Sequence, residues 1–552
     1  MLAAGFFLVL ASGSAAATLT VTNFSDDGSP GTLRHLIENE AKPGDTIVFA
    51  GPGPIELTGS LGIPRRLAGL KIQGPVVLKV DPPPAGSRFR RTLNVNAPKV
   101  TLAGLTFEDL DVRVRKAADV TVRDSTFTEG AEIEVEDSPD ASIRSNSFSG
   151  GSSVWRVRIA GRASGGAEIV GNAIAGGGIE VRGFPRGVTV AGNIITERIG
   201  PSGIRIHSAR GTTIRGNAIA GFGKGIDLET APGANITGNT VAGNGIGINV
   251  ELGSGQRLKG NTVERNGGDG IRIKGEANVI GGTIRDNGGA GIFVSPGGSV
   301  WSSRVKMENN AGPGLDVAPR GVTPNDKRKT ANGNLDSPIT RYDGAARKVR
   351  GRTCGRCRVE VFRTEAGARH GNPGHGEGAR FLGAVVAAPS GAFTWPRKGR
   401  IGCGAARNLT MTTTRTTKKG RVTSEFSGDV GCGAGRGGTK LGSPVRVSPP
   451  LCPAPPAGAE PASCSRTDSF LVFVPRNARN ARCSLVDAAT GVATTPEWPL
   501  FEGFGQEQSP CRFAGTRAGG RVVRLDVKLT NPGDLPDRQF GSRRVRLYAG
   551  WD

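Results

Sequence analysis

The chain has 552 residues, of which 87 are glycine, and 71 lysines and arginines against 48 aspartates and glutamates give it a net charge of +23. This much glycine excludes a mainly helical protein, and after the N-terminus no apolar run reaches the 18 residues of a membrane helix. The positive charge predicts a polyanionic partner but not nucleic acid, because no nucleic-acid-binding motif is present and stacking aromatics are scarce, with 5% aromatic residues and just two tyrosines.

Residues 1–17 are predicted to be a signal peptide. The apolar run 2–10 precedes three alanines at 15–17, which would place cleavage before Thr18. No basic residue precedes the run, so a buried apolar strand is the alternative interpretation. A signal peptide predicts a secreted or cell-surface protein without a transmembrane segment.

Residues 18–69 contain two motifs of a known N-terminal segment. The motifs are Gly-Thr-Leu-Arg-His-Leu-Ile at 31–37 and Pro-Gly-Asp-Thr-Ile-Val-Phe at 43–49. They resemble the opening segment of a family of exported bacterial β-helix repeat proteins. The resemblance implies a cap, an amphipathic helix followed by a strand, that covers the open end of the first coil. Many members carry a cysteine just before this helix, and Gly31-Thr32 stands there instead, so a role for that cysteine does not transfer.

A tetrapeptide of the form Gly-Ile-x-apolar recurs every 21 to 25 residues and predicts the main domain. Its apolar residues alternate, as in a strand with one buried face. Units of about 22 residues with short strands and glycine turns leave no room for helices, so we expect a parallel β-helix of about ten coils over residues 70–330. Hexapeptide periodicity is absent, and the solenoid therefore resembles the right-handed pectate-lyase-like superfamily. The tetrapeptides begin at Gly178, Gly203, Gly225, Gly247, Gly270, Gly291 and Gly314.

A Gly-Asn element recurs with the same period. Because asparagine tolerates turn dihedrals and can hydrogen-bond to an identical residue one coil away, we expect a ladder of asparagines inside a turn. Its expected members are Asn172, Asn193, Asn217, Asn239 and Asn261, with Asn146 as a weaker match.

After residue 326 the period stops. Residues 334–432 resemble the β-sandwich (Ig-like) module that follows the solenoid in the same family, through the motifs at 354–362, 376–383 and 423–427. Residues 433–465 are rich in Gly, Pro and Ala and are expected to be a linker. Alternating apolar segments predict a further β-rich domain over 466–552.

All eight cysteines follow residue 350, in two clusters of four. In an exported chain each cluster is expected to form two disulfides, with three connectivities open in each case. Zinc is the alternative for Cys354 and Cys357, but no second Cys-x-x-Cys accompanies them. The clusters are Cys354, Cys357, Cys403 and Cys432, and Cys452, Cys464, Cys483 and Cys511.

The candidate site is the outward face of coils 178–276. Side chains alternate across a strand, so the third tetrapeptide position and the fifth, just after it, point out of the same sheet. The row at the third position is Glu180, Arg205, Asp227, Asn249, Arg272, Phe293 and Asp316. The row at the fifth position is Arg182, His207, Glu229, Glu251, Lys274, Ser295 and Ala318.

Enzymes of the pectate-lyase-like superfamily act on such a face, and their lyases combine Ca²⁺, held by stacked carboxylates, with an Arg or Lys base. The resemblance implies that Asp227, Glu229 and Glu251 bind Ca²⁺ as a cofactor. The implied catalytic residues are Glu229, Glu251, His207, Arg272 and Lys274. The implied substrate-binding residues are Glu180, Arg182, Arg205, Asp227 and Asn249. In a glycoside-hydrolase-like reaction Glu229 and Glu251 would form the carboxylate pair.

Two interpretations of the face stay open. Alternating charges are also what a solvated β-helix face needs to avoid like-charge stacking. Of the motifs that mark polygalacturonases only Arg272-Ile273-Lys274 is similar, and the Asp-Pro-His-Asp of alginate epimerases is missing. The sequence leaves open whether the protein is an enzyme.

The first functional hypothesis is a secreted protein, expected to be a monomer, that binds an anionic polysaccharide or another cell-envelope polyanion through this face and cleaves or epimerises it. The alternative is a non-enzymatic cell-surface or matrix adhesion protein in which the solenoid is a spacer.

Overall fold

The computed structural model describes residues 16–80 and 91–430, except 152, 324, 326–329, 365–374, 402–408 and 419, together with six strands beyond residue 430. Most of the expected signal peptide and most of the expected linker lie outside the described residues, as do Cys403, Cys432, Cys452 and Cys464. The chain divides into two compact units, Met1–Val241 with Glu251–Leu258, and Ala242–Val250 with Lys259–Asp552. Among the described residues, no helix is long and apolar enough to cross a membrane.

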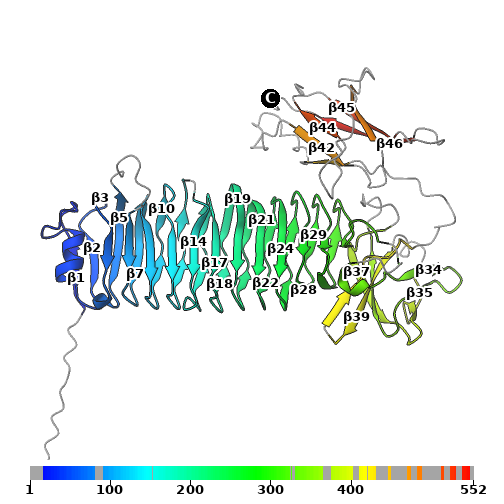
Figure 1. Cartoon of the computed structure of the whole chain (residues 1–552), viewed down its shortest axis with the longest axis horizontal. Helices are drawn as coiled ribbons and strands as arrows, with labels where there is room; N and C mark the ends of the chain where they lie inside the picture. Colours follow the sequence, from blue (N-terminus) through cyan, green and yellow to red (C-terminus); the bar gives the residue numbers. More distant parts are fainter. Residues whose placement is uncertain are drawn as a thin grey trace, which may run out of the picture. The chain divides into compact units, whose positions relative to one another are not determined.

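The first unit begins with β1 (Thr18–Val21), which pairs in parallel with β2 (Thr46–Phe49). Between them lies the predicted amphipathic helix, as α1 (Leu33–His35) and the π-helical turn η1 (Leu36–Glu40). Thr32 caps it by accepting a hydrogen bond from the His35 backbone N–H at 3.2 Å. Its apolar side is buried, and Figure 1 shows the helix beside β1 at the blue end of the stack. A 3-10 turn, η2 (Arg65–Leu67), follows β4.

Each coil of the first unit contributes short strands to three parallel rows (Figure 1). The first row contains β4 (Leu61–Ile63), β6 (Thr92–Val95), β8 (Asp111–Arg115), β11 (Ile133–Glu136), β14 (Trp155–Ala160), β17 (Gly178–Arg182) and the C-terminal parts of β19 (Ile194–His207) and β21 (Ala218–Thr230). The second row contains β2, β5 (Lys71–Val80), β7 (Thr101–Glu108), β9 (Thr121–Arg123), β12 (Ser142–Arg144), β15 (Glu168–Val170), β18 (Thr189–Ala191), β20 (Thr213–Arg215) and β22 (Asn235–Thr237). The third row contains β3 (Pro54–Leu57), the C-terminal parts of β5 and β7, β10 (Thr126–Thr128), β13 (Ser147–Phe148), β16 (Ala173–Ala175) and the N-terminal parts of β19 and β21.

The second unit has the same three kinds of row. Its first row contains β27 (Ile271–Ile273), β30 (Ile292–Val294) and β33 (Leu315–Val317). Its second row contains β28 (Glu276–Ile280) and β31 (Ser299–Ser303). Its third row contains β26 (Thr262–Glu264), β29 (Thr283–Arg285) and β32 (Lys306–Glu308). Three strands are divided between the units, β23 (Thr240–Ala242), β24 (Ile246–Leu252) and β25 (Gln256–Lys259).

The solenoid has about 12 turns rather than the expected ten. Part of the difference arises from β5 and β6, which precede the first expected coil, and part in the range 18–69, which was expected to be a cap only. There β2 and β3 pair in parallel with β5, and β4 pairs with β6, so the ladder is already formed before residue 70. The tetrapeptide does not reveal these turns because their strands lack its glycine.

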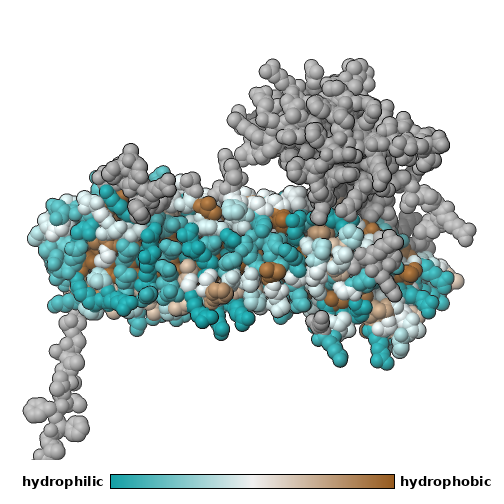
Figure 2. Space-filling model, in the orientation of Figure 1, coloured by the Kyte–Doolittle hydropathy of each residue, from teal (hydrophilic) through white to brown (hydrophobic). Residues whose placement is uncertain are grey.

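Apolar side chains fill the coil interior. In the first row the register partners Ile179, Ile204 and Ile226 are each 0% exposed. Phe127 stacks between Phe107 and Phe148, with ring centroids 4.7 and 4.6 Å apart, close to the spacing of neighbouring strands. Figure 2 accordingly shows hydrophobic residues only as small separate spots on the visible face of the described chain.

The predicted asparagine ladder is confirmed from Asn146 to Asn239, whereas Asn261 is buried and its membership stays a prediction. After Asn146, which accepts from the Ser125 backbone N–H, each asparagine side chain accepts hydrogen bonds from the backbone N–H and Nδ2 of the asparagine one coil earlier, as Asn193 Oδ1 does from Asn172, both at 2.9 Å. The members bonded in this way are Asn146, Asn172, Asn193, Asn217 and Asn239. A second ladder, which the sequence did not reveal, contains Asn244, Asn266, Asn287 and Asn310 in the second unit.

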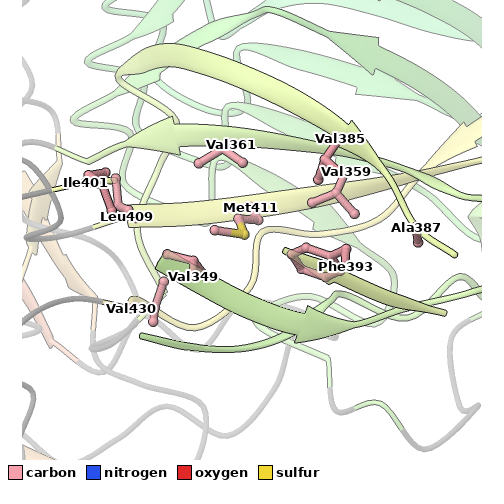
Figure 3. Packing of buried hydrophobic residues seen from close by; sticks show 10 residues of the cluster. All are labelled: Val349, Val359, Val361, Val385, Ala387, Phe393, Ile401, Leu409, Met411 and Val430. Atoms are coloured by element: carbon pink, nitrogen blue, oxygen red, sulfur yellow. The ribbon is translucent and has the colours of Figure 1, made fainter. Parts of the chain in front are cut away.

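Two antiparallel sheets follow the solenoid in the second unit, after the short turn η3 (Asn332–Asn334). One has the order β34 (Ile339–Asp343), β35 (Lys348–Arg352), β38 (Ala392–Trp395). The other has the order β37 (Arg380–Val386), β36 (Arg358–Arg363), β39 (Leu409–Thr417), β40 (Gly420–Thr423). Figure 3 shows side chains of both sheets meeting around Met411, as in a β-sandwich. Cys354 and Cys357 form a disulfide rather than a zinc ligand pair.

Three buried carboxylates of this sandwich bind the last described coil. Glu360 accepts from the Arg304 backbone N–H at 2.9 Å, Glu377 from that of Asn310 at 3.1 Å, and Glu425 from that of Val317 at 2.9 Å. These N–H groups belong to the final coil, which has no following coil of its own to pair with. The sandwich thereby satisfies an edge that would otherwise be open.

Beyond residue 430 the described strands form two antiparallel sheets of three, consistent with the predicted β-rich domain. They are β41 (Arg446–Ser448), β42 (Ser469–Phe473) and β44 (Cys511–Ala514), and β43 (Ala481–Asp487), β45 (Val522–Leu529) and β46 (Arg538–Arg546). β41 lies within the range that was expected to be linker.

Candidate functional site

The first strand row of the first unit carries a series of outward side chains of alternating charge, which we call the charge ladder. Its members are Arg113, Glu134, Arg158, Glu180 and Arg205, which are partners in the strand register. Ion pairs of 3.3 to 3.7 Å join each member to the next. Alternation is required because coils lie only about 4.8 Å apart, where like charges would repel. The alternating row therefore begins three coils before Glu180, where the predicted face starts.

At the end of the charge ladder Glu229 gathers two partners. Arg205 Nη2 lies 2.7 Å from its Oε1, and His207 Nδ1 lies 2.6 Å from its Oε2. Partial burial acts to raise the pKa of Glu229, but the hydrogen bonds from Arg205 and His207 outweigh it and lower the pKa below its ordinary value. The hydrogen bond to Glu229 in turn raises the pKa of Arg205. Both groups are therefore firmly charged at neutral pH.

His207 is held in one orientation by this contact. An ionised carboxylate only accepts hydrogen bonds, so Nδ1 carries the proton and Nε2 of the neutral ring holds the lone pair. The side chain is 48% exposed, which leaves Nε2 accessible. Its register partner Arg182 is 47% exposed and lies 3.6 Å from Glu180. A half-exposed base and a half-exposed cation thus stand next to each other.

Asp227, a predicted calcium and substrate ligand, has other partners. Lys224 Nζ lies 2.9 Å from its Oδ2, and the Ser202 hydroxyl lies 3.4 Å from the same oxygen. Asp227 is 3% exposed, whereas Glu251 in β24 is half-buried. Across the described residues, no group of three or more His, Cys, Asp or Glu side chains is arranged to hold a metal ion. The predicted calcium ligand set, Asp227, Glu229 and Glu251, is thus not assembled.

In the second unit the predicted residue Arg272 belongs to a separate cluster. Arg272 and Arg320 both bind the buried Asp269. Nη2 of Arg272 lies 2.9 Å and Nη2 of Arg320 lies 2.8 Å from the Asp269 Oδ2. The Arg320 guanidinium also lies over the Phe293 ring, 4.0 Å from its centroid. Asn249, the register partner of Arg272, is buried, and Lys274 is exposed at the end of its strand. The segment carrying Arg320 therefore covers this part of the row, and Phe293 serves as its platform.

The structure brings together five of the predicted site residues, Glu180, Arg182, Arg205, His207 and Glu229. Sequence reasoning missed Glu134 and Arg158, although the apolar alternation around them could have extended the row. Lys224 and Asp269 lie three residues before their partners, outside the tetrapeptide positions from which the rows were built. Arg320 follows the last tetrapeptide, which ends at Val317, and no signal in the sequence points to it.

The comparisons with known proteins agree with the fold. Residues 177–322 match the family described as "Right handed beta helix region", and no curated protein matches the chain. The chain therefore contains a right-handed parallel β-helix, as predicted.

Solved structures with a similar arrangement are distant in sequence. The surface adhesin PfbA of Streptococcus pneumoniae is 11% identical, with 56% of this chain and 94% of that chain covered and a TM-score of 0.44. The periplasmic alginate epimerase AlgG is 14% identical, with 50% and 82% covered and a TM-score of 0.31. The tailspike receptor-binding domain of Siphovirus 9NA is 10% identical, with 71% and 96% covered and a TM-score of 0.36.

Proposed function

We propose that the protein is secreted or displayed at the cell surface and binds an anionic polysaccharide, a polyuronate, on the outward face of β17, β19 and β21. The observation that carries the proposal is the contact of His207 Nδ1 with Glu229 at 2.6 Å, beside the half-exposed Arg182. The Cys354–Cys357 disulfide supports an oxidising location outside the cytosol.

The same residues support acid–base chemistry on a bound uronate. Arg182 would pair with the uronate carboxylate. Nε2 of His207 would take the proton from C5, the carbon that bears this carboxylate. The electron pair of that C–H bond moves onto the carboxylate, and Glu229 stabilises the imidazolium. Protonation of that carbon by the solvent from the other face gives the epimer, and the imidazolium then releases its proton to the solvent. Expulsion of the O4 substituent as an alcohol, protonated by the solvent, gives chain cleavage and a C4–C5 double bond.

The experiment incubates the purified full chain with polygalacturonate or polymannuronate and uses dextran as the neutral control. Binding is measured by calorimetry, cleavage by the absorbance of unsaturated ends, and epimerisation by uptake of solvent deuterium at C5. His207→Gln is expected to lower the rate by at least about 100-fold, the usual contribution of a general base, and to change affinity by less than about threefold. His35→Gln, which removes a histidine of the N-terminal helix, is the matched control.

The alternative function, a non-enzymatic adhesion or spacer protein, is favoured by one observation. Every carboxylate of the charge ladder already has an arginine partner within the ladder. Binding of polyuronate without proton exchange or cleavage would reject the acid–base role and leave this alternative. Failure of the unmodified protein to bind any polyuronate would reject the proposed function.

A further inference from the structure

The turn that follows β17 exposes an aromatic ring. Phe184 is 63% exposed and is the only aromatic among the strongly exposed large hydrophobic side chains of the described chain. It lies within Gly183-Phe184-Pro185-Arg186-Gly187, two residues after Arg182. Phe184 follows the candidate site directly, within about 7 Å of extended backbone.

The backbone at Phe184 is unfavourable for this residue. Its φ is +69°, and among the described non-glycine residues with positive φ it is the only apolar one. Left-handed backbone is costly for a residue with a bulky side chain, and a following proline restricts the backbone further. Because the ring is exposed, little buried packing offsets this cost. Strain that the fold does not need points to a role in binding.

Three arginines lie in this turn and in the turns of the coils before and after it. Arg186 and Arg210 are partners in a parallel bridge, and the Arg186 carbonyl accepts from the Gly166 backbone N–H at 3.0 Å, in the turn that contains Arg162. Gly183 packs closely against Gly161, the residue before Arg162. The turns carrying Arg162, Phe184, Arg186 and Arg210 are thus stacked side by side.

These arginines differ from those of the charge ladder. Arg162, Arg186 and Arg210 are exposed, and no ion pair or side-chain hydrogen bond joins them to any residue of the described chain. Each ladder arginine, in contrast, is paired with a glutamate. The ladder arginines are thus held by glutamates, whereas Arg162, Arg186 and Arg210 have no ion-pair partner in the described chain; a nearby carboxylate, Asp137, accepts instead from the Ala163 backbone N–H at 3.3 Å.

We propose that Phe184, Arg162, Arg186 and Arg210 form a sugar-binding subsite that takes the uronate unit next to the one at His207. The inference rests on the proposed function and extends it along the polysaccharide chain. A pyranose ring lies with its apolar face on the Phe184 ring, as aromatic side chains accept such surfaces. The arginines bind the carboxylates of that unit and its neighbour, since a guanidinium matches a carboxylate in shape and charge.

The test measures affinity for oligomers of galacturonate or mannuronate by calorimetry, at low and at physiological salt. Phe184→Ala is expected to weaken binding about fivefold, the size of a single aromatic contact. The double variant Arg186→Gln, Arg210→Gln is expected to weaken binding about fivefold at low salt and to reduce its salt dependence. The matched controls are Ile194→Ala, an exposed apolar residue of the third strand row, and Arg215→Gln, an exposed arginine on β20, and both are expected to bind normally.

Folding of the variants is checked by thermal melting. Phe184→Gly is expected to melt at or above the temperature of the unmodified protein, because glycine adopts a φ of +69° freely, and still to bind as weakly as Phe184→Ala. A large drop in its melting temperature would show that the ring serves the fold and would overturn the inference.

The outcomes separate this inference from the proposed function. Unchanged affinity of Phe184→Ala, with binding by the unmodified protein intact, overturns the subsite alone. Absence of binding by the unmodified protein overturns both. Weakened binding in Phe184→Ala and in the double arginine variant, but in neither control, supports the subsite even where no reaction is detected.

Discussion

Asp316 on β33 is expected to hold its proton to higher pH than an ordinary carboxyl group in the folded protein, so that Asp316→Asn stabilises the second unit at neutral pH. Burial, followed by repulsion from Glu425, raises the pKa of Asp316 well above its ordinary range. The Gly321 backbone N–H donates to its Oδ2 at 3.2 Å, whereas its Oδ1 has no hydrogen-bond partner among the described residues. Asparagine keeps the acceptor for Gly321 and replaces the titrating oxygen with a donor.

The sign follows from the direction of the pKa shift. In the unfolded chain Asp316 loses its proton near the ordinary value of 3.8, but in the folded chain it holds the proton to higher pH. Between the pKa of the unfolded chain and that of the folded chain, the native state therefore binds more protons. The free energy of unfolding falls as the pH rises from 3.8 through the folded pKa. The asparagine has no proton to lose. Since each tenfold difference in proton affinity between the folded and unfolded states corresponds to about 1.4 kcal/mol, the variant is expected to gain at least about 1 kcal/mol at neutral pH.

The assay is urea unfolding of the full chain at acidic, intermediate and neutral pH, followed by circular dichroism. The gain should appear at neutral pH and vanish in acid. Asp343→Asn is the matched control with the opposite sign, because a hydrogen bond from the Ala346 backbone lowers the pKa of Asp343. The reasoning is refuted if Asp316→Asn is less stable than the unmodified protein at neutral pH, or if the difference between them does not change with pH.

Three further changes are expected to alter stability, each measurable by urea unfolding. Glu229→Gln should cost about 1 kcal/mol of stability at neutral pH. This cost should shrink as the pH falls from 4.5 through the lowered pKa of Glu229, because the carboxylate then loses its charge. A cost that persists in acid would contradict the ion-pair explanation. Asn193→Ala should cost about 1–3 kcal/mol of stability because it leaves buried ladder partners unsatisfied. Asn235→Ala, on the outward side of β22, should be nearly neutral. Equal costs would show that the ladder is not the cause. Arg320→Ala should cost about 2 kcal/mol, since the buried Asp269 loses a two-pronged partner, and no loss would mean that Arg272 suffices.

The solenoid could be predicted from the sequence because its coils obey one local rule. The apolar positions of the tetrapeptide, such as Ile179 and Ile204, must fill the interior in every coil, and the recurring asparagine must bond to its neighbour, so both leave a periodic trace. The second ladder was harder to see, because only Asn244 follows a glycine, whereas Asn266, Asn287 and Asn310 follow other residues. The contacts of Glu377 and Glu425 with the last coil could not be predicted at all. They join residues more than 60 positions apart that share no pattern.

The same reasoning explains why the candidate site was only half predictable. A row of side chains on a parallel β-helix must alternate in charge or lose polarity, so Glu180 and Arg205 satisfy the fold whether or not they bind a ligand. A charged residue in the row therefore says little about function. His207 is informative because the fold requires no titratable ring opposite Arg182, and Phe184 is informative because the fold disfavours it there. In a solenoid, function is best sought at residues that the repeat neither requires nor favours, and on this face those are His207 and the turn that begins at Gly183.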